Sequence, residues 1–260
     1  MGITIVLPVS RDNYLQRVFT NLEFLECDRE NTNLLVYIDG DEKLYETARR
    51  YTVNSKFTQK LCVFRAKGLS NAGSIVRRRH RIAAIHNELK TILNPCEFVF
   101  LLEDDTLIPN DTLFKLQKHY RSNPYAGFIS GVEIGRWGLS YIGGWTVDDP
   151  YTINSICSIW DGSELSTIDA SGIYCLMTTY ANYRSHNFKP YDNILGPDFD
   201  FGISMRQAGY KNYIDKSIKC THMTQKGDIT FQNQSIVQIK YTRESDKWTQ
   251  TVIDNISVSI

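Results

Sequence analysis

Three consecutive carboxylates follow an apolar run near the middle of the chain. The apolar run covers residues 98–102, and the acids are Glu103, Asp104 and Asp105. Five apolar residues in a row predict a strand that is buried on both faces of a sheet. Adjacent carboxylates repel one another unless a cation neutralises them, so this cluster suits a hard divalent ion that also grips a diphosphate. The alternative is structural, with Asp105 capping the next helix.

A single acid ends an earlier apolar run. Residues 34–38 predict a second buried strand, and Asp39 follows it directly in an Asp-Gly-Asp turn. Ligands of open α/β sheets bind at the carboxyl ends of the strands, which makes Asp39 a second candidate ligand-binding acid. Capping of the predicted helix at residues 42–51 is an equally good explanation of this residue.

Two acids and a histidine late in the chain could serve proton transfer or metal binding. The pair Gly196-Pro197 predicts the start of a helix whose first turn contains Asp198 and Asp200. Carboxylates at a preformed helix start make a credible general-base site. His222 ends a predicted strand, where it could complete the coordination of a metal, although a lone histidine is more often structural.

A run of basic residues lies in a long predicted helix at residues 71–93. Four arginines and a histidine occupy residues 77–81. Because consecutive residues fan around a helix, not all of them reach one site. Guanidinium groups suit the oxygens of a diphosphate, so Arg77 and Arg81 are candidates for phosphate contact. A solvated basic face is the alternative.

Tryptophans and glycines mark a change in pattern from residue 126 onward. The alternation there predicts short antiparallel strands. Trp145 and Trp160, like Trp137, could form a platform on which an acceptor stacks, but buried tryptophans in a sheet are commoner. Later strands are predicted at residues 168–178, 211–215 and 218–222.

Strands and helices alternate over the first half of the chain. Predicted helices separate four strands, at residues 3–9, 34–38, 60–65 and 98–102. This repetition predicts an α/β fold with a mixed, mostly parallel central sheet that is flanked by helices. The second half predicts a smaller antiparallel sheet.

Composition bounds the classes of function. Lys plus Arg and Asp plus Glu number 29 each in 260 residues, so net charge implies neither nucleic acid nor an anionic membrane as an obligatory partner. No stretch nears the ~18 apolar residues of a spanning helix, and the opening lacks a basic leader, so we expect a cytoplasmic protein without a transmembrane segment. The six cysteines include no CxxC pair and are expected to be reduced core residues.

The order and separation of several segments carry a family resemblance. The segments are ITIVLPVSRDN followed by LLVYIDG, then FVFLLEDDT, then GPDFDFGISMRQAGY. Together they resemble nucleotide-sugar glycosyltransferases of the GT-A fold, particularly the inverting family 2-like group. They are similar to its opening strand and nucleotide-binding turn, its DxD element and the helix start that bears its catalytic base. The resemblance covers roughly residues 3–222.

The resemblance implies roles for the acids at the strand ends. Pro8 and Asp39 would lie at the nucleotide, with Asp39 at the base or ribose. Asp105 would be the direct metal ligand of the DxD element. Glu103 and Asp104 would contact ribose, metal or sugar.

The resemblance extends to the later candidates. Family members place an arginine on the donor phosphates, and Arg77 is best placed for this role by its distance along the chain. His222, in KCTHMT, is similar to the late metal-binding histidine of some GT-A enzymes. Asp198 stands at the position of the base, but Pro197 stands where the family often has an acid, so Asp198 and Asp200 both stay candidates.

The implied activity is transfer of a hexose or pentose from a UDP-sugar or GDP-sugar to an acceptor hydroxyl, with inversion. A divalent ion, manganese or magnesium, would assist it. The acceptor would be a glycan or another hydroxyl-bearing polymer, with modified bases of nucleic acid as a further possibility. The expected organisation is a GT-A domain at residues 1–222, with a nucleotide-binding half at 1–125 and an acceptor-binding half at 126–222, and a C-terminal extension at 223–260.

Two other classes of function compete with this interpretation. A nucleotidyltransferase needs a glycine-rich basic loop after the first strand to hold triphosphate, and SRDNYLQR has no glycine. A non-catalytic sugar-nucleotide-binding or scaffold protein would keep the fold without the chemistry. The separate acids at Asp39, Asp105 and Asp198 argue against that class.

Overall fold

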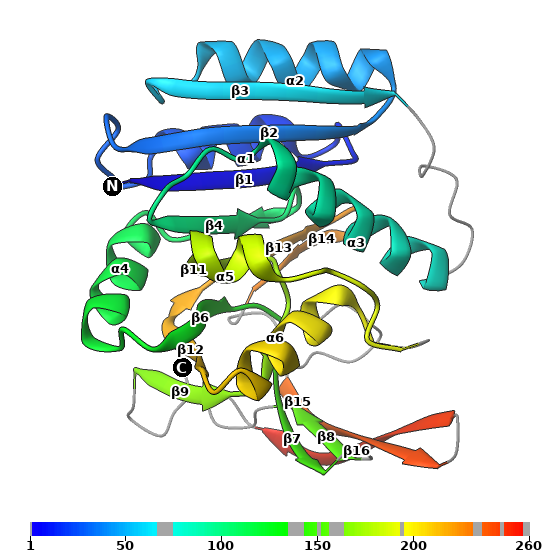
Figure 1. Ribbon diagram of the computed structural model, residues 1–260. Helices are drawn as coiled ribbons and strands as arrows, with labels where there is room; N and C mark the ends of the chain where they lie inside the picture. Colours follow the sequence, from blue (N-terminus) through cyan, green and yellow to red (C-terminus); the bar gives the residue numbers. More distant parts are fainter. Residues whose placement is uncertain are drawn as a thin grey trace.

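A mixed eight-stranded sheet forms the centre of the protein (Figure 1). The computed structural model describes residues 2–66, 75–134, 143–149, 152–155, 164–192, 195–230, 236–244 and 247–256. In sheet order the strands are β3 (Gln59–Ala66), β2 (Thr32–Gly40), β1 (Ile3–Val9), β4 (Phe98–Leu102), β11 (Cys175–Thr179), β6 (Ala126–Val132), β12 (Lys211–Lys219) and β9 (Leu165–Ile168). The first four are parallel, and β11 and β9 run antiparallel to their neighbours. The predicted α/β class and the four early strands are confirmed.

Helices cover both faces of this sheet. One face carries α1 (Leu15–Glu23), α2 (Glu42–Asn54) and α4 (Thr112–Ser122). The other carries α3 (Ile75–Ile92), α5 (Tyr180–Ser185) and α6 (Pro197–Gln207). Side chains alternate between these layers: Ile5 and Leu7 of β1 pack into the cluster that includes α1, and Val6 packs into the cluster that includes α3.

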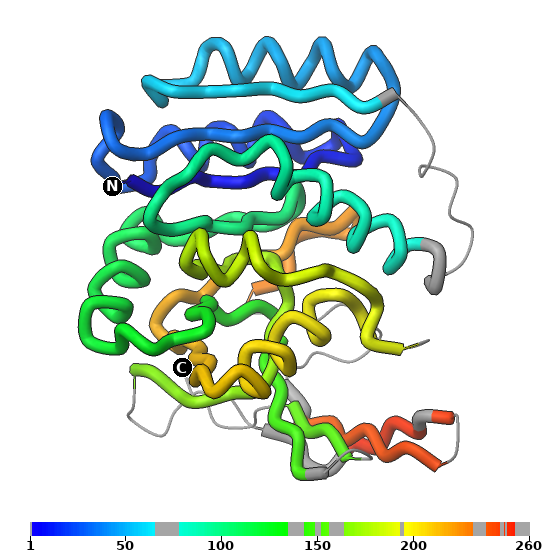
Figure 2. The backbone as a smooth tube through the Cα atoms, in the orientation of Figure 1, coloured from blue at the N-terminus to red at the C-terminus, as the bar shows by residue number. Residues whose placement is uncertain are grey.

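Two smaller antiparallel sheets complete the fold. One contains β10 (Ala170–Ser171), β7 (Gly144–Asp149), β8 (Thr152–Ser155), β15 (Ile236–Glu244) and β16 (Lys247–Ile256). The other contains β14 (Gly227–Ile229), β13 (Thr221–Thr224) and β5 (Thr106–Leu107). Because β15 pairs with β8, the C-terminal strands, orange to red in Figure 2, lie beside strands of the second half.

Three of the predicted strands have different boundaries in the structure. The single strand predicted at residues 168–178 is divided among β9, β10 and β11. A turn separates β10 from β11, where a Cβ on Gly172 would lie 2.6 Å from the ring of Tyr174, so the ring takes the space beside the glycine. The closing strands were predicted at residues 211–215 and 218–222, but the first is the longer β12 and the second is β13. Within β12, the pairing with β6 shifts register after Ile214.

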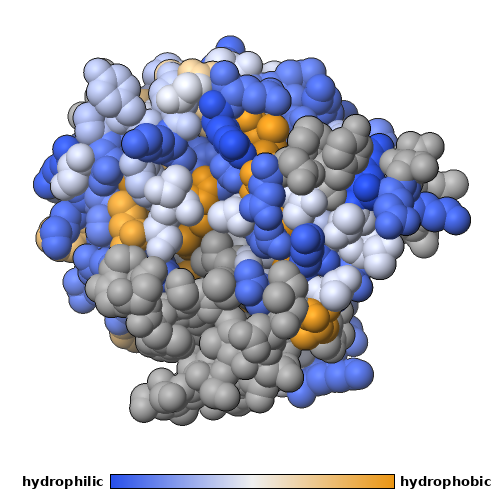
Figure 3. All heavy atoms as spheres, turned by 90° about the horizontal axis from the view of Figure 1, so that it is seen from below, coloured by the Kyte–Doolittle hydropathy of each residue, from blue (hydrophilic) through white to orange (hydrophobic). Residues whose placement is uncertain are grey.

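One face of the molecule is largely polar outside the grey residues (Figure 3). The face in Figure 3 shows mainly hydrophilic atoms around the grey ones, with small separate apolar patches. Among the described residues, none of the helices has the length and apolar character that a membrane crossing needs.

Candidate active site

A polar cleft lies at the carboxyl ends of the central strands. The chain places β2 and β3 on one side of β1 and β4 on the other, so the strand order reverses beside β1. Open α/β sheets bind ligands at such a reversal, outside the carboxyl ends of the strands. The cleft has a volume of about 370 Å³ and is lined by Ser10, Arg11, Asp12, Asp39, Gly40, Asp41, Lys43, Leu44 and Arg81.

Asp104 fixes the loop that follows β1. Its Oδ2 accepts the backbone N–H groups of Ser10 at 2.7 Å and Arg11 at 3.1 Å. Its Oδ1 accepts hydrogen bonds from Nε and Nη2 of Arg11. Only 4% of Asp104 is exposed, and both of its oxygens are engaged. Asp104 therefore positions the loop and the guanidinium that face the cleft.

Asp105 lies between an arginine and a histidine. Its Oδ2 is 2.9 Å from Arg11 Nη2 and 3.4 Å from His222 Nε2. The other ring nitrogen of His222, Nδ1, is 3.4 Å from Glu133 Oε2, and the Thr106 hydroxyl donates to Glu133 Oε1 at 2.7 Å. Asp105 and His222, which are far apart in the sequence, thus meet in one buried cluster.

Asp39 pairs with an arginine of α3. The Nε of Arg81 donates to Asp39 Oδ2, and its Nη2 donates to the backbone carbonyl of Asp39 at 2.9 Å. Asp39 is buried, while Arg81 lines the cleft. Arg81 is therefore a fixed cation at the site, and the alternative of a purely solvated basic face is wrong for this residue.

The helix-capping alternatives are wrong for both strand-end acids. Asp41 caps α2, because its Oδ1 accepts the backbone N–H of Leu44 at 2.8 Å. Asp111 is the N-cap residue of α4. Asp39 and Asp105 are left to face the arginines of the cleft.

The two acids of α6 have different surroundings. A Cβ on Gly196 would lie 2.3 Å from Asp198 Oδ1, so the Asp198 carboxylate folds back over a position that only glycine leaves open. Asp200 is buried, and its Oδ2 lies 3.2 Å from Nε2 of the buried His186. The His186 ring packs edge-on against Phe201. Asp200 thus belongs to the core, and Asp198 is the acid that stands at the helix start.

Asp198 is not among the residues that line the cleft, and helix α3 is the element that contacts α6 and also carries Arg81 of the cleft. Burial raises the pKa of Asp198, and hydrogen bonds from backbone N–H groups and the charge of Arg79 oppose that rise. Arg79 lies two residues before Arg81 on α3, and α3 contacts α6. The start of α3 and the start of α6 lie at the side of the molecule where β2 and β3 end, the right-hand side in Figure 1. Arg81 of α3 therefore pairs with Asp39, and the charge of Arg79 on the same helix acts on Asp198.

The raised pKa of Asp198 predicts a stability effect with a defined sign. The ionised folded state is disfavoured, so the wild type loses stability as pH rises from the unfolded pKa of ~3.9 through the higher folded pKa. Asparagine carries no charge at any pH. We expect Asp198→Asn to melt at a higher temperature than the wild type at about pH 8, and the gain to shrink towards about pH 3. Thermal melts at both pH values check this, and a lower melting temperature at about pH 8 would contradict it.

The structure gives fewer contacts for the other predicted donor-site residues, Pro8, Glu103 and Arg77. Pro8 lies in β1, opposite Tyr37 of β2, one residue before the end of the strand. Glu103 directly follows β4. Burial lowers the pKa of Arg11, but the charges of Asp104, Asp105 and Glu103 raise it above its usual value. The side chain of Arg77 lies outside the described residues.

Of the predicted acceptor tryptophans, Trp145 lies in β7 and is half-buried. Its ring centroid is 5.6 Å from that of Tyr241 in β15, and it packs against the cluster that contains Phe199 of α6. Trp145 thus lies beside the helix that carries Asp198. Trp160 and Trp137 fall outside the described residues.

Sequence reasoning missed Arg11 and Glu133. Arg11 is the first basic residue after β1. Its position indicates a site residue only when the contact between this loop and Asp104 is known. Glu133 interrupts an apolar stretch next to β6. A buried acid is rare without a partner, so this interruption could have marked it.

The buried cluster fits part of a metal site. A carboxylate and an imidazole are both ligands of divalent ions, and Asp105 and His222 supply one of each. Across the described ranges, no three His, Cys, Asp or Glu side chains are grouped so as to hold an ion. Two protein ligands suit an ion whose shell is completed by substrate phosphates and water.

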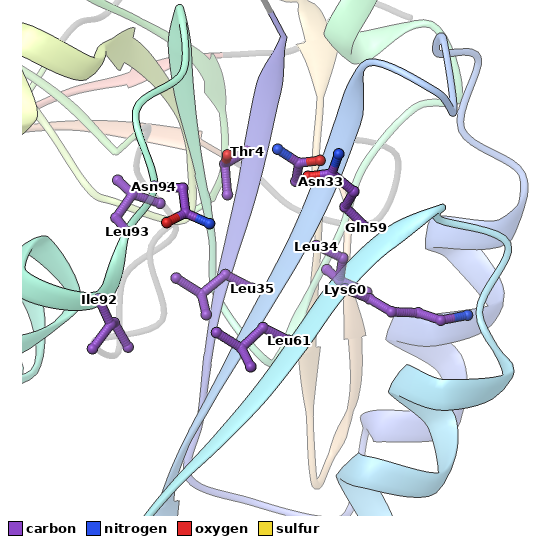
Figure 4. A pocket seen from close by; sticks show the side chains of 10 residues that line it. All are labelled: Thr4, Asn33, Leu34, Leu35, Gln59, Lys60, Leu61, Ile92, Leu93 and Asn94. Carbon is purple, nitrogen blue, oxygen red and sulfur yellow. The ribbon is translucent and has the colours of Figure 1, made fainter.

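A second hollow lies at the opposite edge of the sheet (Figure 4). It has a volume of about 250 Å³ and borders the amino ends of β1, β2 and β3. Its lining contains no carboxylate; the residues are Thr4, Asn33, Leu34, Leu35, Gln59, Lys60, Leu61, Ile92, Leu93 and Asn94. The acidic candidate residues therefore lie at the other cleft, at the carboxyl ends of the strands.

Comparison with known proteins gives matches at the level of structure. No protein-family model matches the sequence, and neither does any of the curated proteins with which it was compared. The mannosyltransferase PcManGT from Pyrobaculum calidifontis, solved with GDP-Man and Mn2+, is similar with a TM-score of 0.56 and 14% identity over 81% of this chain and 53% of its own.

S. aureus TarS 1-349, solved with UDP-GlcNAc, is similar with a TM-score of 0.52 and 13% identity over 83% of this chain and 55% of its own. The chain therefore spans about half the length of these two proteins. At such identities the likeness concerns the fold alone. The chain has the GT-A-like α/β fold that these nucleotide-sugar glycosyltransferases share.

Proposed function

We propose that the protein transfers a sugar from a nucleoside-diphosphate sugar to an acceptor hydroxyl. The observation that carries this proposal is the cleft at the strand reversal. Asp39, Arg81 and Arg11 line it, and the buried carboxylates of Asp104 and Asp105 lie directly behind Arg11. The solved structures of similar fold, which hold GDP-Man with Mn2+ and UDP-GlcNAc, support it.

The donor site is proposed at this cleft. Asp39 and Arg81 would hold the nucleoside, near the end of the strand that contains Pro8. Glu103 and Asp104 would contact ribose or sugar, with Asp104 acting mainly through the loop that it fixes. Arg77 of α3 is proposed as a further phosphate contact.

The charge of the cleft argues for a cation beside the donor. Acidic side chains outnumber basic ones in and directly behind its lining: Asp12, Asp39, Asp41, Glu103, Asp104 and Asp105 against Arg11, Lys43 and Arg81. A diphosphate would be repelled by this excess unless a positive ion came with it. Asp105 and His222 would hold that ion, manganese or magnesium. When bound, the ion would neutralise charge that builds on the leaving diphosphate.

Asp198 is the proposed general base for an inverting transfer. Its raised pKa makes the carboxylate a better proton acceptor, while Asp200 is held by His186 in the core. Trp145, beside α6, is proposed to border the acceptor, which would be a glycan or another hydroxyl-bearing polymer. Trp160 is proposed as a further residue that contacts the acceptor, and modified nucleic acid bases are a further class of acceptor.

A thermal-shift screen of nucleotide sugars, with and without manganese, tests the donor class. A ligand at 100 times its dissociation constant adds ~2.7 kcal/mol to the free energy of unfolding. We expect a UDP-sugar or a GDP-sugar to stabilise the protein, and more so with manganese. Asp39→Asn should lose the shift, because Arg81 loses its anchor.

Asp28→Asn is the matched control. Asp28 is an exposed carboxylate just before β2, at the opposite edge of the sheet, so its removal should leave the shift unchanged. No shift with any nucleotide sugar would favour a non-catalytic scaffold. Equal thermal shifts in Asp39→Asn and Asp28→Asn would show that the donor does not bind at Asp39.

A further inference from the structure

Arg11 neutralises the acids to which the proposed ion would bind. Its Nη2 lies 2.9 Å from Asp105 Oδ2, and its Nε lies 3.1 Å from Asp104 Oδ1. Asp105 is fully buried and Asp104 nearly so, which makes their attraction to a paired cation stronger than at an exposed site. The chain thus supplies its own positive charge at the carboxylate that a divalent ion would need.

His222 gives an independent sign that Asp105 binds a ligand. The residue is only 2% exposed, and its Nε2 is aimed at Asp105 Oδ2 from 3.4 Å. Within the described part of the chain, neither ring nitrogen of His222 makes a hydrogen bond. Buried polar groups normally have such partners, and an imidazole without them beside a carboxylate is a ligand pair for a divalent ion.

We propose that Arg11 is a built-in counter-ion of Asp105 that a divalent ion must displace. The ion and the guanidinium compete for the same oxygen, Oδ2, because two positive groups cannot share it without strong repulsion. This inference rests on the proposed function only in taking the ion to be the one that accompanies the donor.

The backbone allows this displacement without loss of the loop. Asp104 Oδ2 accepts the N–H groups of Ser10 and Arg11, so the main chain stays anchored when the Arg11 side chain leaves. The Arg11 side chain is 38% exposed and borders the cleft, which gives it space to move. A donor diphosphate would offer the released guanidinium a new anion. The ion therefore binds weakly alone and tightly together with the donor, which is positive coupling between two ligands.

Manganese binding without any donor tests the proposal. The free-ion signal in electron paramagnetic resonance gives the dissociation constant directly. We expect Arg11→Gln to bind manganese about tenfold or more tightly than the wild type, because the competing charge is gone. The double variant Arg11→Gln with Asp105→Asn should lose this gain.

Arg17→Gln is the matched control for the loss of an arginine. Arg17 lies on α1 and pairs with Asp228 at 2.6 Å, both partly exposed, so its substitution should leave manganese affinity unchanged. Equal or weaker affinity in folded Arg11→Gln would overturn the proposal, as would the absence of measurable binding to both proteins. If Arg11→Gln fails to fold, Arg11→Lys, which loses the forked contact, should still bind more tightly than the wild type, and unchanged affinity would overturn the proposal.

The outcome is separable from that of the proposed function. Tighter manganese binding in Arg11→Gln, with no nucleotide sugar stabilising either protein, would keep the counter-ion and reject the donor. Stabilisation by a nucleotide sugar with unchanged manganese affinity would keep the donor and reject the counter-ion.

Discussion

Asp198→Asn should lower turnover of the nucleotide sugar by ~100 to 10,000-fold while donor affinity stays unchanged, because general-base catalysis contributes that much when the base is well placed. The carboxylate folds back over Gly196 at the start of α6, and burial raises its pKa. Asparagine keeps the size and the hydrogen-bonding oxygen but cannot accept a proton. The loss should therefore fall on the chemical step.

The measurement does not need the acceptor. Water can replace the acceptor, so mass spectrometry of the released sugar gives the rate of donor hydrolysis. Calorimetry gives the donor affinity. Asp200→Asn is the informative comparison, because its carboxylate faces His186 in the core. That variant should lose stability, on the order of 1–3 kcal/mol, before it loses rate. Full turnover by Asp198→Asn, or an equal rate loss in a stable Asp200→Asn, would reject Asp198 as the base.

The positions of the strand-end acids could be predicted because they follow from local pattern and one rule of sheet architecture. Continuous apolar runs fixed β2 and β4 as buried strands, and parallel strands end at the same edge. Asp39 and Asp105 therefore had to lie at one edge of the sheet. The pairing of Asp105 with His222 followed less directly, since it depends on β13 pairing with β5.

The partners of these acids could not be predicted, because they depend on contacts between distant segments. Arg11 reaches Asp104 across 93 residues of sequence, and Asp39 meets Arg81 across 42. Nothing in a run of consecutive arginines says which of them turns towards a given acid. The hydrophobic pattern only excludes the buried stripe of the helix.

The C-terminal strands also could not be predicted from the local sequence pattern. Strands β15 and β16 form an antiparallel pair, and the described side chains of β16 are exposed. Strands with one solvated face carry polar residues that weaken the alternation from which strands are recognised. Pairing of β15 with β8 fixes the position of both strands. That neighbour lies more than 80 residues earlier in the chain.

Asp105→Asn should abolish the effect of manganese on donor binding and donor hydrolysis. Asp105 supplies a carboxylate oxygen that lies beside both Arg11 and His222. Asparagine keeps the volume of the side chain but removes the negative charge that would hold a divalent ion beside the Arg11 guanidinium. Asp39 and Arg81 are untouched, so the metal-independent part of donor binding should persist.

Thermal shifts measured with the nucleotide sugar, with manganese and with both isolate this effect. In the wild type the shift with both ligands should exceed the sum of the separate shifts, because ion and donor would complete one coordination shell. In Asp105→Asn that excess should vanish, and donor hydrolysis should no longer respond to manganese. Asp28→Asn should keep both responses, since its exposed carboxylate lies before β2. If Asp105→Asn keeps the manganese-dependent excess, the ion binds elsewhere and Asp105 serves only to hold Arg11.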